Sequence, residues 1–265
     1  MRLKGKVAMV TGGGSGIGRA IVLALAREGA DILIPDIQMA NAEAVVREVR
    51  GLGRTSIAQR VDVTNEAEIQ TSIRDGIRAF GQIDILVNNA GVNPGLGLPF
   101  MRQVEADWDK VFDVNVKSVF FTCKTIAPHF MERRAGKIVN IASIAGPLSS
   151  TTMPSYSVSK MGIVTFTKIV AKDLAPYNVN VNAICPGFLW TPMWENLAKW
   201  FRSNVPHLAD KNEKEIFEDR VKSMTPLLRP QTPEDIANLA AFLVSDQAGN
   251  LTGQSINLDG GTVMH

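Results

Sequence analysis

The sequence predicts a single α/β domain with a doubly wound, seven-stranded parallel sheet and helices on both faces. Three observations predict it. Short β-rich apolar runs alternate with longer segments of helical spacing, no linker or repeat divides the 265 residues, and 45% of the residues are hydrophobic. This alternation indicates βαβ units, because parallel neighbours need a crossover of a dozen or more residues. The apolar content suffices for one sizeable core and excludes wholesale disorder.

The strands are expected at the apolar runs, over residues 6–11, 31–36, 56–61, 83–88, 137–143, 179–184 and 255–258. Helices are expected between the first six strands, over residues 16–28, 40–51, 66–80, 107–133 and 155–175. Gly51 and Gly81 are typical of the left-handed position that ends a helix. A last helix is expected at residues 234–245, because Thr232 provides an N-cap and Pro233 suits the first helical position.

Residues 188–230 break this alternation. They hold three of the four tryptophans and a polar segment of helical spacing around residues 210–222. Loops longer than about 12–15 residues in a compact domain are usually functional or disordered. We therefore expect a substrate lid at about 188–230 within one domain that spans residues 1–265.

The charge and cysteine content exclude several classes of function. With 28 basic and 26 acidic residues, the net charge of +2 provides no global field for nucleic acid or an anionic membrane. No apolar stretch reaches the roughly 18–20 residues of a membrane span. Cys123 and Cys185 form neither a disulfide framework nor a metal signature, and the three histidines are scattered. We expect a cytoplasmic protein that binds no nucleic acid, membrane or metal.

A glycine run follows the first expected strand and opens the first expected helix. Gly12, Gly16 and Gly18 give the spacing G-x-x-x-G-x-G. Glycines at such a junction let the backbone approach a pyrophosphate, whose charge is met by N–H groups at the helix start. The run therefore predicts a phosphate-binding turn, with an ordinary glycine-rich turn as the alternative.

Asp36 ends the second expected strand, eighteen residues after Gly18. A dinucleotide fold places there the carboxylate that binds the adenosine ribose and repels a 2′-phosphate. Positions 15 and 37, Ser and Ile, provide no cation for such a phosphate. Arg19 is interpreted as a helix or surface residue. The pattern therefore favours NAD over NADP, although a solvated turn Asp would give the same residue.

Tyr156 and Lys160 are four residues apart at the start of an expected helix, so they share one face. A nearby ammonium favours the phenolate, and we therefore expect Lys160 to lower the pKa of Tyr156 toward neutrality. Ser143 ends the fifth strand, at the sheet edge where ligands of α/β folds bind. The three residues predict acid/base chemistry on a substrate oxygen, although a half-buried Tyr beside a solvated Lys is the common alternative.

Motifs in fixed order along the whole chain resemble the short-chain dehydrogenase/reductase family. They lie at residues 11–18, Asp62, Asn88-Asn89-Ala90-Gly91, Asn115, Ser143, Tyr156-Ser157-Val158-Ser159-Lys160, Pro186-Gly187 and Asp259-Gly260-Gly261. The resemblance implies a Rossmann-like fold and a nicotinamide-dependent oxidoreductase. It also implies a homo-oligomer, a tetramer or dimer, paired through the helices at residues 107–133 and 155–175.

The resemblance implies roles for single residues. The catalytic set would be Asn115, Ser143, Tyr156 and Lys160, with Asn115 holding a water that links Lys160 to solvent. The cofactor would contact Gly12, Gly16, Ile17, Gly18, Asp36, Asp62, Val63, Asn88, Ala90, Gly91, Tyr156, Lys160, Pro186, Gly187 and Thr191. Asn89 is interpreted as a residue that stabilises the central sheet.

The substrate is expected between residues 145–153, the loop at residues 92–99 and the lid. The candidate contacts are mostly apolar: Ser143, Ala145, Leu148, Met153, Tyr156, Phe188, Trp190 and Trp194. A small core within the lid is an equal alternative for the aromatic residues. We expect NAD(H)-dependent interconversion of a secondary alcohol and its ketone. The alternatives are a 3-oxoacyl-thioester reductase and a nucleotide-binding regulator without catalysis.

Overall fold

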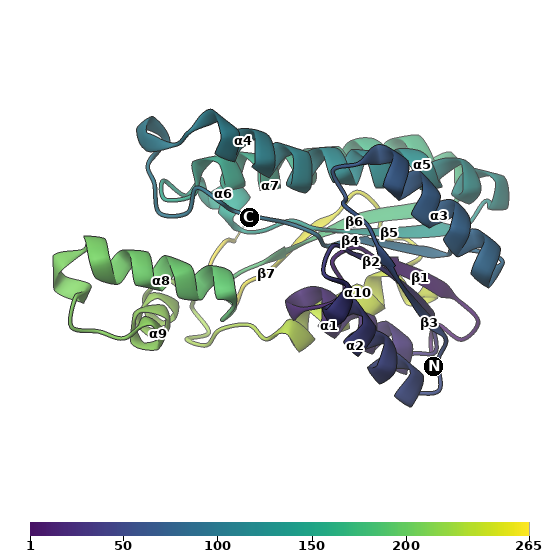
Figure 1. Ribbon diagram of the computed structural model, residues 1–265, viewed down its shortest axis with the longest axis horizontal. Helices are drawn as coiled ribbons and strands as arrows, with labels where there is room; N and C mark the ends of the chain where they lie inside the picture. Colours follow the sequence, from purple (N-terminus) through teal and green to yellow (C-terminus); the bar gives the residue numbers. More distant parts are fainter. Residues whose placement is uncertain (265) are drawn as a thin grey trace.

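The computed structural model describes residues 1–264, and its centre is a seven-stranded parallel sheet (Figure 1). The strands are β1 (Val7–Val10), β2 (Asp31–Asp36), β3 (Ser56–Arg60), β4 (Ile85–Asn88), β5 (Gly136–Ile141), β6 (Val179–Pro186) and β7 (Ser255–Leu258). Their order is β3-β2-β1-β4-β5-β6-β7, and every neighbouring pair is parallel. The order reverses between β1 and β4. The predicted fold class is confirmed, and ligands of such sheets bind where the order reverses.

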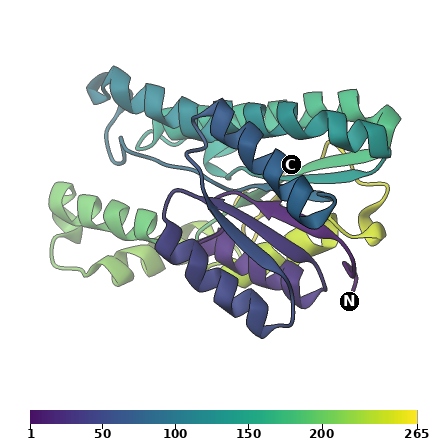
Figure 2. The same cartoon turned by 45° about the vertical axis from the view of Figure 1, so that its right-hand side comes forward.

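Helices cover both faces of the sheet, as Figures 1 and 2 show. One layer contains α1 (Gly16–Arg27), α2 (Met39–Gly51) and α10 (Pro233–Leu243), and the other contains α3 (Glu66–Phe80), α5 (Ser118–Arg133) and α7 (Pro154–Leu174). The strands therefore lie between two apolar layers. In β1, Ala8 and Val10 pack into the first layer, whereas Val7 and Met9 pack into the second. Burial on both faces explains why these strands are continuous apolar runs.

Most of the expected helices and caps are confirmed, but Gly51 is still helical and the left-handed residue after α2 is Gly53. Asn65 accepts bonds from the N–H groups of Ala67 and Glu68 at the start of α3, and Gly81 ends that helix with φ of 82°. Thr232 and Asp235 form a capping box at the start of α10. The helix expected at 107–133 is instead divided into α4 (Glu105–Phe112), a π-helical turn (Asp113–Lys117) and α5. π-turns within helices often mark functional sites.

The segment at 188–230 forms a helical hairpin that projects from the body of the molecule (Figure 1). It contains α8 (Pro192–Asn204) and α9 (Glu213–Met224). The polar helix expected at 210–222 is confirmed as α9. The sequence analysis missed α8 and the short α6 (Ala145–Leu148). The signal for α8 was present, because Thr191 caps it and Pro192 is its first residue, as Thr232 and Pro233 are in α10.

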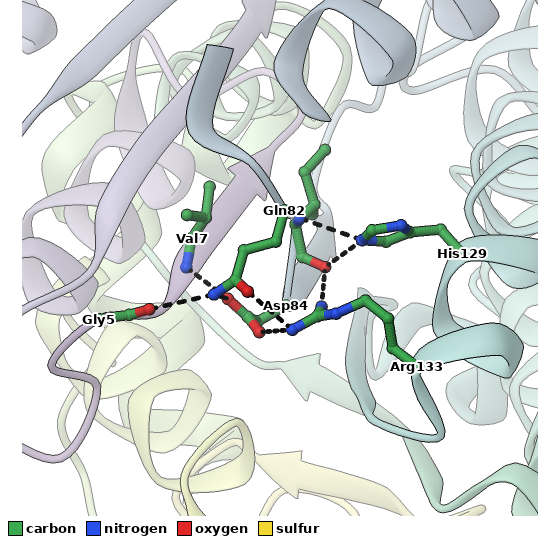
Figure 3. A network of polar contacts seen from close by, with 7 residues as sticks. Gly5, Val7, Gln82, Asp84, His129 and Arg133 are labelled. Carbon is green, nitrogen blue, oxygen red and sulfur yellow. Dashed lines mark hydrogen bonds and ion pairs between the residues drawn. The ribbon is translucent and has the colours of Figure 1, made fainter. Parts of the chain in front are cut away.

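A polar network joins the amino ends of the central strands β1 and β4 to α5 (Figure 3). The buried Asp84 carboxylate accepts bonds from the Val7 N–H at 2.8 Å and the Gln82 amide at 2.9 Å. The Arg133 guanidinium, at the end of α5, donates to Asp84 at 2.8 Å and to the Ile83 carbonyl at 2.9 Å. This network joins β1, β4 and α5 on the side of the sheet away from the carboxyl ends of the strands.

Candidate active site

A cleft of about 1050 Å³ lies at the carboxyl ends of the strands. Most of the expected site residues line it: Gly12, Gly16, Ile17, Gly18, Asp36, Asp62, Val63, Ala90, Gly91, Ser143, Ala145, Met153, Tyr156, Lys160, Pro186, Gly187, Thr191 and Trp194. The other five expected residues lie outside the lining: Asn88, Asn115, Leu148, Phe188 and Trp190. One cavity therefore collects residues from the ends of six strands.

The glycine turn between β1 and α1 requires glycine for two reasons, a lack of space at Gly18 and a positive φ at Gly16. A Cβ on Gly18 would collide with the Gly12 carbonyl and with the Asn89 side chain. Gly16, at φ of 51°, has no atom within 4 Å of the place where a Cβ would lie. The turn is fixed from β4, because the Asn89 amide donates to the carbonyls of Thr11 and Gly12 at 3.1 and 3.0 Å. This contact agrees with the structural role expected for Asn89.

Asp36 stands at the end of β2 with both carboxylate oxygens in backbone hydrogen bonds. Oδ2 accepts from the Gly14 N–H and Oδ1 from the Gln38 N–H, both at 2.9 Å. The carboxylate is thereby held at the wall of the cleft beside the glycine turn. Arg19 points elsewhere, since its guanidinium pairs with Glu48 on α2 and does not line the cleft. The interpretation of Arg19 as a surface residue is confirmed.

Asp62 follows β3 and lines the same end of the cleft. Its Oδ1 accepts bonds from the Thr64 N–H at 2.9 Å and the Thr64 hydroxyl at 2.7 Å. These bonds lower the pKa of Asp62, because they stabilise its charged form. The β2 and β3 end of the cleft is therefore polar and acidic.

Tyr156 and Lys160 share a face of the first turns of α7, as expected, and the Lys160 Nζ lies 5.6 Å from the centre of the Tyr156 ring. The expected lowering of the Tyr156 pKa is wrong for this arrangement. Burial of the hydroxyl raises the pKa of Tyr156 to about 12, although a hydrogen bond with Ser143 opposes the rise. The Lys160 ammonium donates to the Ile141 carbonyl at 2.8 Å, and burial lowers the pKa of Lys160 to about 8. Burial thus outweighs the attraction that the spacing suggested.

Asn115 lies in the π-turn, buried beside the cleft. Its Oδ1 accepts from the Val92 N–H at 2.8 Å, and its Nδ2 donates to the Val92 carbonyl at 3.0 Å and to the Ser159 hydroxyl at 3.1 Å. Ser159 in turn donates to the Tyr156 carbonyl at 2.7 Å. The side chain of Asn115 therefore joins the loop after β4 to the turn that carries Tyr156. Ser159 belongs to the motif at residues 156–160, but the sequence alone indicated no role for it.

Asn88 does not line the cleft, which corrects its expected place beside the cofactor. It is buried between β4, β5 and α5. Its amide donates to Asn140 at 2.9 Å and accepts from the Thr122 hydroxyl at 2.7 Å. Asn88 is therefore a structural residue beneath the site, and the sequence contains no local signal for its partners.

The lid aromatics mostly form a small core of their own, so the structure decides between the two alternatives. Phe188 is buried and Trp190 packs edge-on against Phe217 at 5.2 Å between ring centres. Trp194 lies 5.2 Å from both Phe188 and Phe217, and it also lines the cleft. Leu148 is exposed outside the cleft. Of Leu148, Phe188, Trp190 and Trp194, all expected to contact the substrate, Trp194 is the one that lines the cleft.

The cleft fits a nicotinamide dinucleotide. The turn without side chains at Gly12, Gly16 and Gly18 suits a pyrophosphate, and Asp36 is placed for ribose hydroxyls. Pro186, Gly187 and Thr191 line the cleft beside Tyr156 and would contact the nicotinamide end. Within residues 1–264, no group of three His, Cys, Asp or Glu side chains could hold a metal ion. No helix in that same range is long and apolar enough to cross a membrane.

Comparisons with known proteins identify relatives over nearly the whole chain. A family model described as enoyl-(acyl carrier protein) reductase matches residues 12–263. The chain is 38% identical over 264 residues to the 3-oxoacyl-[acyl-carrier-protein] reductase FabG of Thermotoga maritima, with 100% of both chains covered. It is also 38% identical over 264 residues to a 3-oxoacyl-[acyl-carrier-protein] reductase of Synechocystis, covering 99% of this chain and 98% of that one.

Two solved structures resemble the fold throughout. The structure of an NAD+-bound xylitol dehydrogenase gives a TM-score of 0.93 at 33% identity and covers 98% of this chain and 100% of that one. A levodione reductase gives 0.91 at 32% identity and 98% of both chains. A family match over nearly the whole chain, with full-length relatives at this identity, shows that the chain belongs to the short-chain dehydrogenase/reductase family of oxidoreductases.

Proposed function

We propose that the protein interconverts a secondary alcohol and its ketone with NAD(H) as cofactor. The observation that carries this proposal is the joining of two sites in one cleft. The glycine turn and Asp36 lie at one end, and Tyr156, Ser143 and Lys160 lie at the other. A binding protein without catalysis has no need for the second group.

Tyr156 would exchange a proton with the substrate oxygen. In oxidation, its Oη accepts the hydroxyl proton of the alcohol as the carbinol carbon loses a hydride, and in reduction it returns the proton to the carbonyl oxygen. A bound nicotinamide supplies the hydride or accepts it. Ser143 would donate a hydrogen bond to the same oxygen and hold it beside Tyr156. The protein thus contributes placement and proton transfer.

Lys160 would lower the cost of the Tyr156 phenolate. Its ammonium is anchored on the Ile141 carbonyl at the floor of the cleft, one helical turn from Tyr156. In that position it would bond a ribose hydroxyl of the cofactor. Asn115 would complete the set by fixing Val92 and Ser159 around the pair, and a relay water at Asn115 stays a prediction.

Asp36 supports NAD over NADP. Both of its oxygens are fixed toward the β2 end of the cleft, where a 2′-phosphate would meet a carboxylate. Lys110 and Lys160 are the cations among the lining residues, and neither stands on the segments after β1 or β2.

Spectrophotometry of the nicotinamide with a panel of secondary alcohols and ketones tests this function. We expect turnover with NAD(H), and a kcat/KM for NAD at least about tenfold above that for NADP. Tight NAD binding without turnover of any substrate would leave only the regulator alternative. Equal kcat/KM with the two cofactors would show that Asp36 does not discriminate.

A 3-oxoacyl thioester is the second candidate substrate class. The relatives from Thermotoga maritima and Synechocystis carry the name 3-oxoacyl-[acyl-carrier-protein] reductase. An acetoacetyl thioester therefore belongs in the same panel, and a kcat/KM above that of every simple ketone would favour this class.

We also propose that the chain forms a homo-oligomer through α5 and α7. Their outer faces expose Phe120, Met161 and Ile169 between 44% and 51%. Apolar side chains gathered on two long helices are typical of a protein interface. Sedimentation velocity tests this, with a dimer or tetramer expected and a monomer at micromolar concentration contradicting it.

A further inference from the structure

The substrate half of the cleft differs in chemistry from the cofactor half. The segments at the ends of β2 and β3 contribute both acidic carboxylates among the polar lining residues Asp36, Gln38, Asn41, Asp62 and Thr64, together with the apolar Pro35, Ile37, Val61 and Val63. The segments that begin at the ends of β5 and β6 contribute mainly apolar ones: Ile141, Ala142, Ala145, Met153, Pro186, Leu189, Pro192, Met193 and Trp194. Because the sheet order separates these strand pairs, the two chemistries lie at opposite ends of the cleft.

Hydrogen-bonding groups are few at the substrate end. The side chains that supply them after β5 and β6 are Ser143, Tyr156, Lys160 and Thr191, and each already has a role in the proposed reaction. The remaining charged lining residues, Asp109, Lys110 and Asp113, belong to α4 and its π-turn. A substrate with several hydroxyl groups would leave most of them without partners against Met153, Met193 and Trp194.

Two aromatic neighbours hold the Trp194 side chain in place at the apolar side of the cleft. Its ring packs against Phe188, which is buried under the lid, and against Phe217 of α9, which is fully buried. Trp194 therefore offers a fixed apolar surface rather than a side chain free to turn away. Thr191 caps α8 by accepting a bond from the Trp194 N–H at 3.3 Å, which sets the start of the same helix.

The loop after β4 contacts both segments that carry the apolar lining, at residues outside the cleft itself. The Gly97 N–H donates to the Thr152 carbonyl at 2.8 Å, immediately before Met153. On its other side Gly97 packs on Trp200, so closely that a Cβ there would lie 2.5 Å from the indole. Trp200 stands six residues beyond Trp194, about 9 Å along α8. The loop thus bridges both walls beyond the apolar lining.

We infer that the substrate is an uncharged ketone, or its secondary alcohol, whose neighbouring groups are apolar, as in an alicyclic ketone, and that Met153, Met193 and Trp194 select it. This inference rests on the proposed function. The apolar walls offer no hydrogen-bond partners to the hydroxyl groups of a polyol or to the amide groups in the arm of an acyl thioester. Met153 stands three positions before Tyr156 in the sequence and lines the same cleft.

The first test compares kcat/KM for a substituted cyclohexanone, xylitol and an acetoacetyl thioester, with the matching nicotinamide in each direction. We expect the alicyclic substrate to be preferred at least about tenfold. Preference for xylitol or the thioester would overturn the inference and leave the proposed oxidoreductase function intact. No turnover in any arm would overturn the proposed function itself, and the inference with it.

Two variants sharpen the test. Met153→Gln places an amide of similar size on the apolar wall, and we expect kcat/KM for the alicyclic ketone to fall at least about tenfold with the NAD Kd unchanged. Met101→Gln is the matched control, because Met101 is 81% exposed outside the cleft. Equal effects of Met153→Gln and Met101→Gln would contradict the assignment.

Discussion

The spacing of Tyr156 and Lys160 predicted how their side chains are arranged but not the pKa of Tyr156. The four-residue interval placed both side chains on one face of a helix, and the structure confirms the pair. The direction of the Tyr156 pKa could not be predicted, because it depends on how deeply the fold buries the hydroxyl. The same holds for Asn88, whose partners Asn140 and Thr122 come from distant elements.

The pKa values of Tyr156 and Lys160 predict how kcat/KM depends on pH. In oxidation Tyr156 must be deprotonated, and its pKa of about 12 means that the phenolate fraction grows steadily above neutral pH. We expect kcat/KM for oxidation to rise by about one log unit per pH unit up to about pH 8 and to level off above it, where Lys160 loses the charge that supports the phenolate. In reduction the phenol is already protonated, so the profile should stay level until Lys160 loses its charge near pH 8 and then fall. An oxidation profile already level at pH 7 would show that Tyr156 titrates far lower.

At the scale of elements, caps and periodicity predicted the strands and most helices. The start of α8 carries the same Thr-Pro signal as α10, and Trp194, Leu197, Ala198 and Phe201 follow at helical spacing, so this helix was predictable from the sequence although it was missed. The π-turn at Asp113–Lys117 could not be predicted, since it depends on Asn115 reaching Val92 and Ser159 across the fold. The site therefore depends on a local departure from regular helix.

The turn that follows α9 contains a strained residue. Leu228 has φ of 52° and is 64% exposed, so its side chain gains little from packing. A left-handed conformation costs an L-residue about 1–2 kcal/mol, which glycine avoids at an entropic cost of about 0.5–1 kcal/mol. We expect Leu228→Gly to raise the free energy of unfolding by up to about 1 kcal/mol, measured by urea denaturation.

Leu227→Gly is the matched control for this change. Leu227 is 60% exposed but is not among the residues with positive φ. Leu227→Gly should lower the free energy of unfolding by about 0.5–1 kcal/mol, because glycine adds entropy to the unfolded chain. A loss of stability in both variants would show that Leu228 is not strained.

For the whole molecule, the parallel sheet and its two helical layers followed from the alternation of apolar runs and helical spacing. The different roles of the carboxyl and amino ends of the strands could not be predicted from that alternation. The carboxyl edge holds the cleft, whereas the amino edge holds the Asp84 and Arg133 network of Figure 3. Such long-range pairs have no sequence signal, because they join residues 49 positions apart.

Removing the Arg133 guanidinium should separate stability from activity. Arg133→Met leaves the buried Asp84 carboxylate without its cation but with its bonds from Val7 and Gln82, and we expect the free energy of unfolding to fall by about 1–3 kcal/mol. The kcat/KM should stay within about twofold, because the site lies at the other edge. Arg74→Met is the control, since Arg74 pairs with Asp75 at the surface and should cost less than about 0.5 kcal/mol. A large drop in kcat/KM for Arg133→Met would show that the two edges are coupled.

The most direct test of the account is the turnover of Tyr156→Phe beside its NAD affinity. Removal of the one hydroxyl that transfers the proton should lower kcat by about two to four orders of magnitude, while the NAD Kd from fluorescence titration stays unchanged. Tyr177→Phe, at the other tyrosine of the chain, should keep full activity. A Tyr156→Phe enzyme that retains kcat within about tenfold of the wild type would contradict the assignment of Tyr156 as the acid/base.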